Sequence, residues 1–332
     1  MIETTEIFAA SFNHCSTVCP HQNGALIAWY SGISECHDDQ SVHLIFIGQN
    51  GSSDIVRIGD KTGNPVLWRS GDDIFILWSR FEDDGEIVRL ADRWKYCSLW
   101  VQKIEIEDKP VLVGKPECIV GSNHNLLGRC PVLHRNNQIL LPLYDEVEGT
   151  CVILDGTRFT ELSRFGSGLI QPTLWTKYNK LHALSRNFRT RKIRAQHIQS
   201  SDGKNWFPST DTEIFNVNNS LCVVNVRNSE AIVWNDTTSR YRDKLTLGLL
   251  KNYGCLEAIP VSVLGPKYGS YPFCAVSDDR LHITFTNVRK RIEYHVWKWE
   301  DVTEACRRNL VRASADRRNH AHSRSKADAE IL

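Results

Sequence analysis

The stretch GNPVLWRSGDDIFILWSR, residues 63–80, contains the pattern that decides the fold. Two apolar runs flank a short polar turn that holds Gly71 and two aspartates, which is typical of a β-hairpin. The same pattern recurs five more times along the chain. The further copies, at residues 15–31, 129–146, 170–187, 219–236 and 270–287, read CSTVCPHQNGALIAWYS, RCPVLHRNNQILLPLYDE, IQPTLWTKYNKLHALSRN, NSLCVVNVRNSEAIVWND and SYPFCAVSDDRLHITFTN.

The spacing of these hairpins predicts the architecture. Their second strands start 48, 65, 42, 49 and 51 residues apart, at Ala25, Asp73, Gln138, Lys180, Ser229 and Arg280. A period of about 40–50 residues that is built from hairpins is the signature of a β-propeller. Six copies predict an all-β, six-bladed β-propeller, and further apolar runs supply its outer strands. These runs are SVHLIFIG (41–48), CSLWVQKIEI (97–106), TCVILDG (150–156), KIRAQHIQS (192–200), KLTLGLLKN (244–252) and IEYHVWKW (292–299).

The repeat assigns residues 1–303 to one propeller domain. The remaining residues, 304–332, include the basic and polar run RRNLVRASADRRNHAHSRSK (307–326), which has almost nothing to bury. Such a composition predicts a short, disordered C-terminal tail.

Composition bears on partners and location. The 332 residues carry 40 Lys and Arg against 39 Asp and Glu, a formal net charge of +1. This balance gives no electrostatic reason to expect nucleic acid or an anionic membrane as a partner. No apolar run approaches the roughly 18 residues of a membrane span, and the start MIETTEIFAASF is acidic where a secretory signal is basic. We therefore expect a cytoplasmic protein without a membrane segment, whose oligomeric state the sequence does not reveal.

The eleven cysteines lie mostly inside apolar runs, where a free cysteine behaves as a small buried hydrophobe. Three of them, with three histidines nearby, offer the side chains of a zinc site, but their spacings do not repeat as paired cysteine motifs do. We therefore predict no metal ion. The six residues concerned are Cys15, Cys19, Cys36, His14, His21 and His37.

Corresponding positions of successive blades converge on one mouth of a propeller's channel. Two rings of polar residues are expected there, one before the first strands and one after the second strands. Strand ends are where polar turn residues belong, but turns do not favour Arg or Tyr. We therefore predict a site for a polar, hydrogen-bond-rich ligand. The rings consist of Asn13, His14, Asn64, Arg129, Gln171, Asn218, Asn219 and Tyr271, and of Tyr30, Ser31, Ser79, Arg80, Asp145, Glu146, Arg186, Asn187, Asn235, Asp236, Thr286 and Asn287.

The run SSDGKNW, residues 200–206, resembles a degenerate Asp box, a turn in which an Asp caps the hairpin and a Trp packs beneath it. Together with the phrases GNPVL, QPTL, SYP and HITFT, it makes most of residues 11–300 similar to the sialidase superfamily. The resemblance is to the divergent branch of six-bladed propellers with Asp-box, or BNR, repeats. Because an Asp box is structural, it supports the fold and says nothing of activity.

The resemblance implies a set of catalytic residues: an Arg triad that holds a carboxylate, a Tyr nucleophile assisted by a Glu, and an Asp acid/base on a flexible loop. Asp38, in LIAWYSGISECHDDQSVHLIF, falls at the acid position, with Asp39 as a one-residue alternative. Tyr271 falls at the nucleophile position. Arg186 and Arg242 match the second and third Arg. No cofactor is needed for this chemistry.

Two positions depart from the family's pattern. Asn13 or His14 stands where the first Arg is expected, and Gln171, which cannot take a proton, stands near the expected Glu. Losing one Arg weakens a bidentate clamp on a carboxylate.

Three residues of the third hairpin offer replacements: Arg129 for the clamp, and Asp145 or Glu146 for the base. Together with Asn64 and Gln171 they complete the predicted substrate-binding set. The leading hypothesis is a sialidase-like exo-glycoside hydrolase acting on a terminal acidic sugar, sialic acid or a relative. The alternative is a catalytically inactive propeller that binds glycan or another polar partner.

Overall fold

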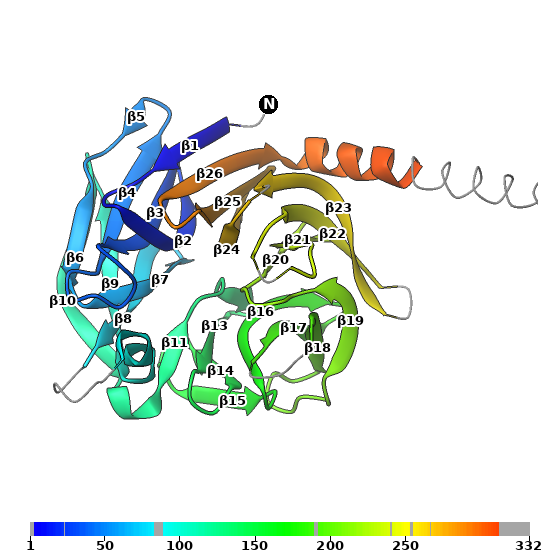
Figure 1. The fold of residues 1–332 in the computed structure, drawn as a ribbon, viewed down its shortest axis with the longest axis horizontal. Coiled ribbons are helices and arrows are strands. Elements are labelled where there is room, and N and C mark those ends of the chain that lie inside the picture. Colours follow the sequence, from blue (N-terminus) through cyan, green and yellow to red (C-terminus); the bar gives the residue numbers. More distant parts are fainter. Residues whose placement is uncertain are drawn as a thin grey trace, which may run out of the picture.

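The computed structural model describes residues 3–22, 24–82, 89–188, 192–239, 241–252, 255–265 and 267–311. These residues form six antiparallel sheets that surround a central channel (Figure 1). The predicted all-β, six-bladed propeller is therefore confirmed. In the paragraphs below the blades are numbered from 1 to 6 in chain order, and the strands of each are given from the channel outward.

Blades 1 to 3 use the first half of the chain. Blade 1 consists of β2 (Phe12–His21), β3 (Gly24–Gly32) and β4 (Ser41–Gly48), with β5 (Gly51–Ser52) and β6 (Val56–Asp60) beside β4. Blade 2 consists of β7 (Thr62–Ser70), β8 (Asp73–Phe81), β9 (Cys97–Ile106) and β10 (Pro110–Val120), with the 3₁₀ turns η1 (Leu90–Lys95) and η2 (Ser122–His124). Blade 3 consists of β11 (Leu126–Gly128), β12 (Leu133–Arg135), β13 (Gln138–Asp145), β14 (Thr150–Asp155) and β15 (Glu161–Phe165).

Blades 4 to 6 complete the ring. Blade 4 consists of β16 (Leu169–Lys177), β17 (Lys180–Asn187), β18 (Arg194–Ser200) and β19 (Thr210–Phe215). Blade 5 consists of β20 (Cys222–Val226), β21 (Ser229–Asn235), β22 (Leu245–Asn252) and β23 (Leu256–Gly265). Blade 6 consists of β24 (Gly269–Ser277), β25 (Arg280–Asn287), β26 (Arg291–Lys298) and β1 (Glu3–Ile7).

Blade 6 takes its outermost strand from the other end of the chain. β1 pairs antiparallel with β26, and Ile7 lies opposite Ile292. Both side chains are buried, at 4% and 0% exposure, in the apolar core that lies between the blades. The ring is therefore closed by strand pairing as well as by packing.

The innermost strands carry a repeated irregularity that prepares the site. The pairing of β2, β7, β16 and β24 with the next strand shifts by a bulge near the channel mouth. At each bulge one residue has positive φ, between 46° and 55°, an uncommon conformation for residues other than glycine. A bulge re-aims the side chain of its extra residue, and here it does so at one end of four blades. The four residues are Cys15, Asn64, Gln171 and Tyr271.

A helix of residues 299–311 follows β26 (Figure 1). Trp299, Val302 and Cys306 are buried at helical spacing, and Asn309 Nδ2 donates to the carbonyl oxygen of Pro260 in β23 at 3.0 Å. The predicted boundary at 303/304 lies inside this helix, so the tail prediction is wrong for residues 304–311, because this apolar stripe docks the helix on blades 5 and 6. Residues 312–332 lie outside the described residues.

Among the described residues, no helix combines the length and the apolar character that a membrane crossing requires.

Candidate functional site

Residues of blades 4, 5 and 6 form one hydrogen-bonded network at the bulged mouth of the channel. Arg186 Nη1 donates to Gln171 Oε1 at 3.2 Å, and its Nη2 donates to Asn218 Oδ1. Arg242 Nε donates to the carbonyl oxygen of Asn218 at 2.9 Å, and its Nη2 donates to the Tyr271 hydroxyl at 3.4 Å. The structure thus brings together four of the predicted site residues, with Asn218 as the link between the two arginines.

Tyr271 is held from several sides in this network. Its backbone N–H donates to Asn219 Oδ1 at 3.1 Å, and its half-buried ring lies against two guanidinium groups. The ring centroid is 4.8 Å from the Arg242 guanidinium carbon and 5.4 Å from that of Arg129. Two cations beside the phenol favour negative charge developing on its oxygen during a reaction.

Arg242 keeps its charge although it is largely enclosed. Burial acts to lower the pKa of Arg242, but its neighbours, first Tyr271 and then Cys15 and Glu35, outweigh burial and raise the pKa overall. The guanidinium therefore offers a permanent positive charge at the channel mouth.

Arg129 lies deeper, at 1% exposure, where its guanidinium bridges two other blades. Its Nη1 donates to the carbonyl oxygen of Ser16 at 3.0 Å, and its Nη2 donates to the carbonyls of Tyr271 and Pro272. Through these contacts Arg129 supports the backbone beneath Tyr271 as a structural brace. They do not favour the predicted role of Arg129 in the carboxylate clamp.

The Asp145 carboxylate is turned to its own blade. Its Oδ1 accepts from the backbone N–H groups of Val147 and Glu148, both at 2.8 Å, and its Oδ2 lies 3.5 Å from Arg164 Nη1. At 4% exposure the carboxylate caps a turn. The predicted role of Asp145 as the base for Tyr271 is not favoured by this arrangement.

Glu146, Gln171 and Asn64 complete the predicted set. Burial, followed by the charge of Glu146, raises the pKa of Tyr144 well above its usual value. Gln171 Nε2 donates to that phenol oxygen at 3.4 Å and so connects it to Arg186. Asn64, 6% exposed, occupies the corresponding bulge of β7.

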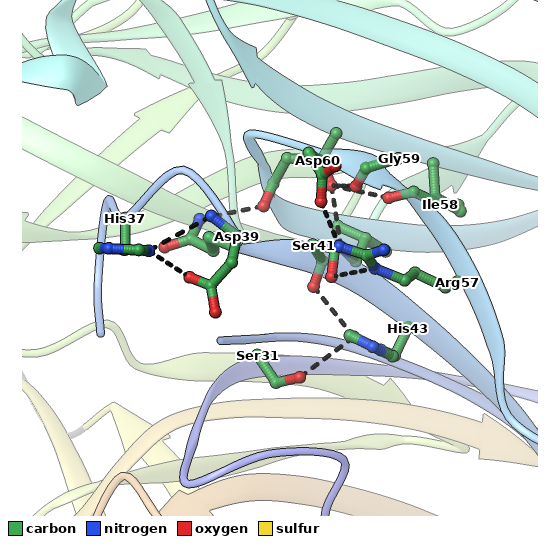
Figure 2. Close-up of polar contacts among 12 residues, drawn as sticks. Ser31, His37, Asp39, Ser41, His43, Arg57, Ile58, Gly59 and Asp60 are labelled. Carbon is green, nitrogen blue, oxygen red and sulfur yellow. Dashed lines mark hydrogen bonds and ion pairs between the residues drawn. The ribbon is translucent and has the colours of Figure 1, made fainter. Parts of the chain in front are cut away.

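Asp38 and Asp39 lie on the loop between β3 and β4, and they differ in their surroundings. Asp38 is 66% exposed, and its Oδ1 lies 2.8 Å from Arg93 Nη2 of η1. Asp39 accepts from the N–H of Ile33 at 2.9 Å, and its Oδ1 lies 2.5 Å from His37 Nδ1. Figure 2 shows this imidazole beside the Asp39 carboxylate. Asp39 therefore organises the loop, and Asp38 is the more accessible of the two alternatives for a proton donor.

His14 is a site residue whose role the sequence analysis missed. It is fully buried, its Nδ1 lies 3.1 Å from Thr286 Oγ1, and its ring meets the Tyr271 ring edge-on at 4.6 Å. Its Nε2 has no hydrogen-bond partner among the described residues. Burial, followed by the charges of Arg289, Arg242 and Arg129, holds the pKa of His14 well below 6.5. The imidazole is therefore neutral at neutral pH, and its surroundings oppose the charged form.

Arg289 and Glu35 were missed as well, because they lie just beyond the strand ends that defined the rings. Arg289 Nη1 lies 3.0 Å from Glu35 Oε2, and Glu35 Oε1 accepts from the Tyr30 hydroxyl at 3.3 Å. Arg289 and Arg242 share the wall of a cavity of about 430 Å³ together with Asn218 and Tyr268. A third arginine thus reaches the mouth from the turn between β25 and β26.

A metal site is a separate question. Across the described ranges, no group of three or more His, Cys, Asp or Glu side chains is placed to hold a metal ion. The catalytic and binding roles of the residues above stay predictions.

Comparisons with known proteins bear on the family and the fold. The sequence pattern of the BNR repeat-like domain matches residues 24–283. Trypanosoma rangeli sialidase in complex with sialic acid is similar in structure, with a TM-score of 0.64 at 14% identity over 96% of this chain and 62% of that chain. A mutant of that sialidase displaying trans-sialidase activity has a TM-score of 0.65, 14% identity and the same coverage.

A phage phi92 endosialidase has a TM-score of 0.58 at 9% identity, over 90% of this chain and 69% of that chain. At these identities the likenesses show the fold alone. The chain spans about three fifths of the length of the Trypanosoma rangeli structures. No curated protein matches this chain by sequence.

Proposed function

This chain belongs to the family of BNR repeat-like domains, and we propose that it is a sialidase-like exo-glycoside hydrolase acting on a terminal acidic sugar, sialic acid or a relative. The observation that carries the proposal is the network of Arg186, Asn218, Arg242 and Tyr271 at the channel mouth. It connects two guanidinium groups, through Asn218, to a phenol that Arg242 contacts directly, and a carboxylate-bearing sugar calls for such a combination. A structural neighbour, Trypanosoma rangeli sialidase, is solved with sialic acid bound.

Arg186 and Arg242 are proposed to hold the sugar carboxylate, with Arg289 as a third donor. Planar guanidinium groups bind carboxylates through paired, charge-assisted hydrogen bonds. Arg289 stands in place of the first Arg of the family, whose position Asn13 and His14 occupy. Its present partner, Glu35, has to release it for this role.

Tyr271 is proposed as the nucleophile. A neutral phenol approaches an anomeric carbon that bears a carboxylate without the repulsion that a carboxylate nucleophile meets. As the phenol oxygen attacks, its proton has to pass to a base, and the neutral imidazole of His14, whose ring lies edge-on to the Tyr271 ring at 4.6 Å, is proposed to take it in place of the family's Glu. Burial and the three arginines that lower the pKa of His14 oppose this proton transfer, so the imidazole keeps the proton only briefly. Arg242 and Arg129 stabilise the negative charge that develops on the phenol oxygen.

Asp38 is proposed to protonate the leaving oxygen. The ionised carboxylate pairs with Arg93, so Asp38 has to separate from Arg93 when it carries the proton. In the second step the Asp38 carboxylate takes a proton from the water that attacks the anomeric carbon. The bond to Tyr271 breaks, and the phenol recovers its proton from His14.

A second candidate function is glycan binding without turnover. Two observations favour it: Gln171 replaces the expected Glu, and the Asp145 carboxylate is engaged by Arg164 and two backbone N–H groups. Under this alternative the arginines bind the acidic sugar and Tyr271 serves only as a packing surface.

A cytoplasmic location is proposed from the cysteines. All eleven are free thiols, and nine of them are buried, which suits a reducing compartment.

The test compares wild type with Tyr271→Phe and His14→Gln in hydrolysis of an aryl sialoside and in calorimetric binding of sialic acid. We expect both variants to lose at least about a thousandfold in kcat, and Tyr271→Phe to bind sialic acid within a few-fold of wild type. Binding without wild-type hydrolysis across a panel of aryl glycosides selects the second candidate. Absence of both binding and hydrolysis contradicts both.

A further inference from the structure

The guanidinium of Arg289 is held at the edge of the candidate site. Arg289 lies in the turn between β25 and β26, and its backbone carbonyl oxygen accepts from the N–H of Asn13 at 2.9 Å. Its guanidinium carbon lies 5.9 Å from the centroid of the Phe12 ring. Arg289 and Arg242 line the same cavity of about 430 Å³. Both cations therefore face one space in which an anion fits.

The free protein already presents a carboxylate to Arg289. Glu35 lies on the loop between β3 and β4 of blade 1, and its Oε2 is 3.0 Å from Arg289 Nη1. Its Oε1 accepts from the Tyr30 hydroxyl at 3.3 Å. One guanidinium and one phenol thus hold the two oxygens of this carboxylate, as they would hold the carboxylate of a ligand.

The Tyr30 phenol keeps its proton in this arrangement. Tyr30 is fully buried, and burial, followed by the charges of Cys15 and Glu35, raises its pKa well above the usual value. The hydroxyl therefore stays a donor to Glu35. Burial lowers the pKa of Arg242, and Glu35 is among the neighbours, after Tyr271, that raise it overall. The charge of Glu35 therefore acts on both cations of the cavity.

The pair of Glu35 and Arg289 is weak enough to exchange. The Arg289 and Glu35 side chains are 48% and 31% exposed. Ion pairs at such exposure shift an equilibrium by no more than about fivefold. A ligand carboxylate is therefore able to displace Glu35, but its binding constant is lowered by the strength of the pair that it breaks. A neutral sugar leaves the pair intact and loses nothing.

We propose that Glu35 is an internal competitor of the sugar carboxylate and sets how strongly the site prefers acidic over neutral sugars. Its carboxylate occupies Arg289 in the free protein and leaves Arg289 when an acidic sugar binds. This role rests on the proposed function, because it requires Arg289 to be a donor to the sugar carboxylate. Glu35 thus limits the affinity for the acid without contacting the sugar.

The experiment is calorimetric titration of the full chain with sialic acid and with its methyl ester, which is the same sugar without the charge. Glu35→Gln keeps the length of the side chain and an oxygen for the Tyr30 hydroxyl, but it removes the charge that pairs with Arg289. We expect this variant to bind sialic acid about fivefold more tightly than wild type and to bind the ester within twofold of wild type. Glu35→Ala is a second variant with the same expected result, so a folding defect in one leaves the other to decide.

Two further variants separate competition from a general effect of charge. Glu148→Gln removes one negative charge from the loop between β13 and β14, at the same end of the propeller, where Glu148 is 65% exposed and lies 3.7 Å from Arg164. It should change the affinity for sialic acid less than twofold. In an Arg289→Gln background, Glu35→Gln should bring no gain, because the competition acts through Arg289.

Two results overturn the internal competitor and leave the proposed function standing. In the first, wild type binds sialic acid and neither Glu35 variant binds it more tightly. In the second, Glu148→Gln brings the same gain as Glu35→Gln. If neither wild type nor any variant binds sialic acid at millimolar concentration, the competitor and the carboxylate clamp both fall.

Discussion

At the scale of single residues, a positive φ on four innermost strands turns four unlike side chains toward one mouth of the channel. Such a conformation costs a residue with a Cβ roughly 1 kcal/mol, so its surroundings must hold it in place. Tyr271 shows how this is done. Its N–H is bound by Asn219 and its carbonyl oxygen by Arg129, so both neighbouring peptide groups are fixed.

Replacing Arg186 by Ala tests the carboxylate clamp. Removing one charged donor should weaken binding of an acidic sugar by at least about tenfold, because a hydrogen bond between charged groups contributes about 1.5–3 kcal/mol. Binding of a neutral sugar should change less than twofold. Titration calorimetry measures both, with Arg194→Ala, an arginine of the same blade paired with Glu213, as the control. An equal loss for both sugars would show that no clamp exists.

Replacing Arg129 by Gln tests the brace beneath Tyr271. A glutamine cannot reach the carbonyls of blades 1 and 6 together, and buried acceptors without donors are costly. We expect the free energy of unfolding to fall by about 2–4 kcal/mol in urea denaturation. Arg80→Gln, at a position 51% exposed, should change it by less than about 0.5 kcal/mol. Similar effects of the two substitutions would contradict the structural role.

At the scale of elements, the Asp box links two blades. Asp202 Oδ1 accepts from the N–H groups of Lys204 and Asn205, both at 2.8 Å, and the hydrogen bonds from Asn205 lower the pKa of Asp202. The turn places Trp206 on Phe165 of blade 3, with ring centroids 4.0 Å apart, and its Nε1 donates to Ser163 Oγ at 3.1 Å. The motif therefore fastens blade 4 to the outer strand of blade 3.

Trp206→Ala should lower the free energy of unfolding by about 2 kcal/mol, because it removes a stacked aromatic pair and much of the apolar area covered between the blades. Trp206→Phe keeps the stacking and loses the hydrogen bond, so we expect a loss of only about 1 kcal/mol. Equilibrium urea unfolding of the two variants gives the comparison. A loss for Phe as large as the loss for Ala would assign the stability to the hydrogen bond alone.

At the scale of the whole molecule, the sequence predicted the hairpins closely. β8, β13, β17, β21 and β25 begin at the predicted residues, and β3 begins one residue earlier, at Gly24. The resemblance to sialidase-like BNR propellers is confirmed. Local patterns sufficed because each hairpin carries its own turn residues and alternating apolar positions.

The site was less predictable, because its geometry depends on partners from distant parts of the chain. Arg129 donates to Ser16, 113 positions away, so its burial has no local signal. The hairpin repeat likewise does not predict that Asp145 caps a turn, or that Arg289 pairs with Glu35. The sequence did contain one signal for the bulges, because a proline follows three of the four bulge residues. Proline has no N–H to pair in a sheet and is therefore found at bulges.

Buried histidines predict a loss of stability in acid. Burial lowers the pKa of His197 and of His282 to about 4, and it also lowers the pKa of His14 well below 6.5. For His197 and His282, between pH 6.5 and 4 the unfolded chain therefore binds protons that the folded chain excludes, and stability falls as pH falls. Each such histidine lowers the free energy of unfolding by up to about 1.4 kcal/mol for every pH unit by which the pH falls in this range.

Urea unfolding from pH 7 to pH 4.5 measures this dependence. His282→Gln should make the slope shallower by about one proton relative to wild type. An unchanged slope for His282→Gln would contradict the assignment.

The pairing of β1 with β26 also sets the order of events during synthesis. β1 leaves the ribosome almost 290 residues before its partner strand exists, so blade 6 stays incomplete until β26 has been made. During that time β1 is an unpaired strand, which is a hazard for aggregation. The sequence of β1, ETTEI, reduces this hazard, because it carries two like charges and only one apolar side chain. The segment that closes the ring last is thus also one that resists pairing with other nascent chains.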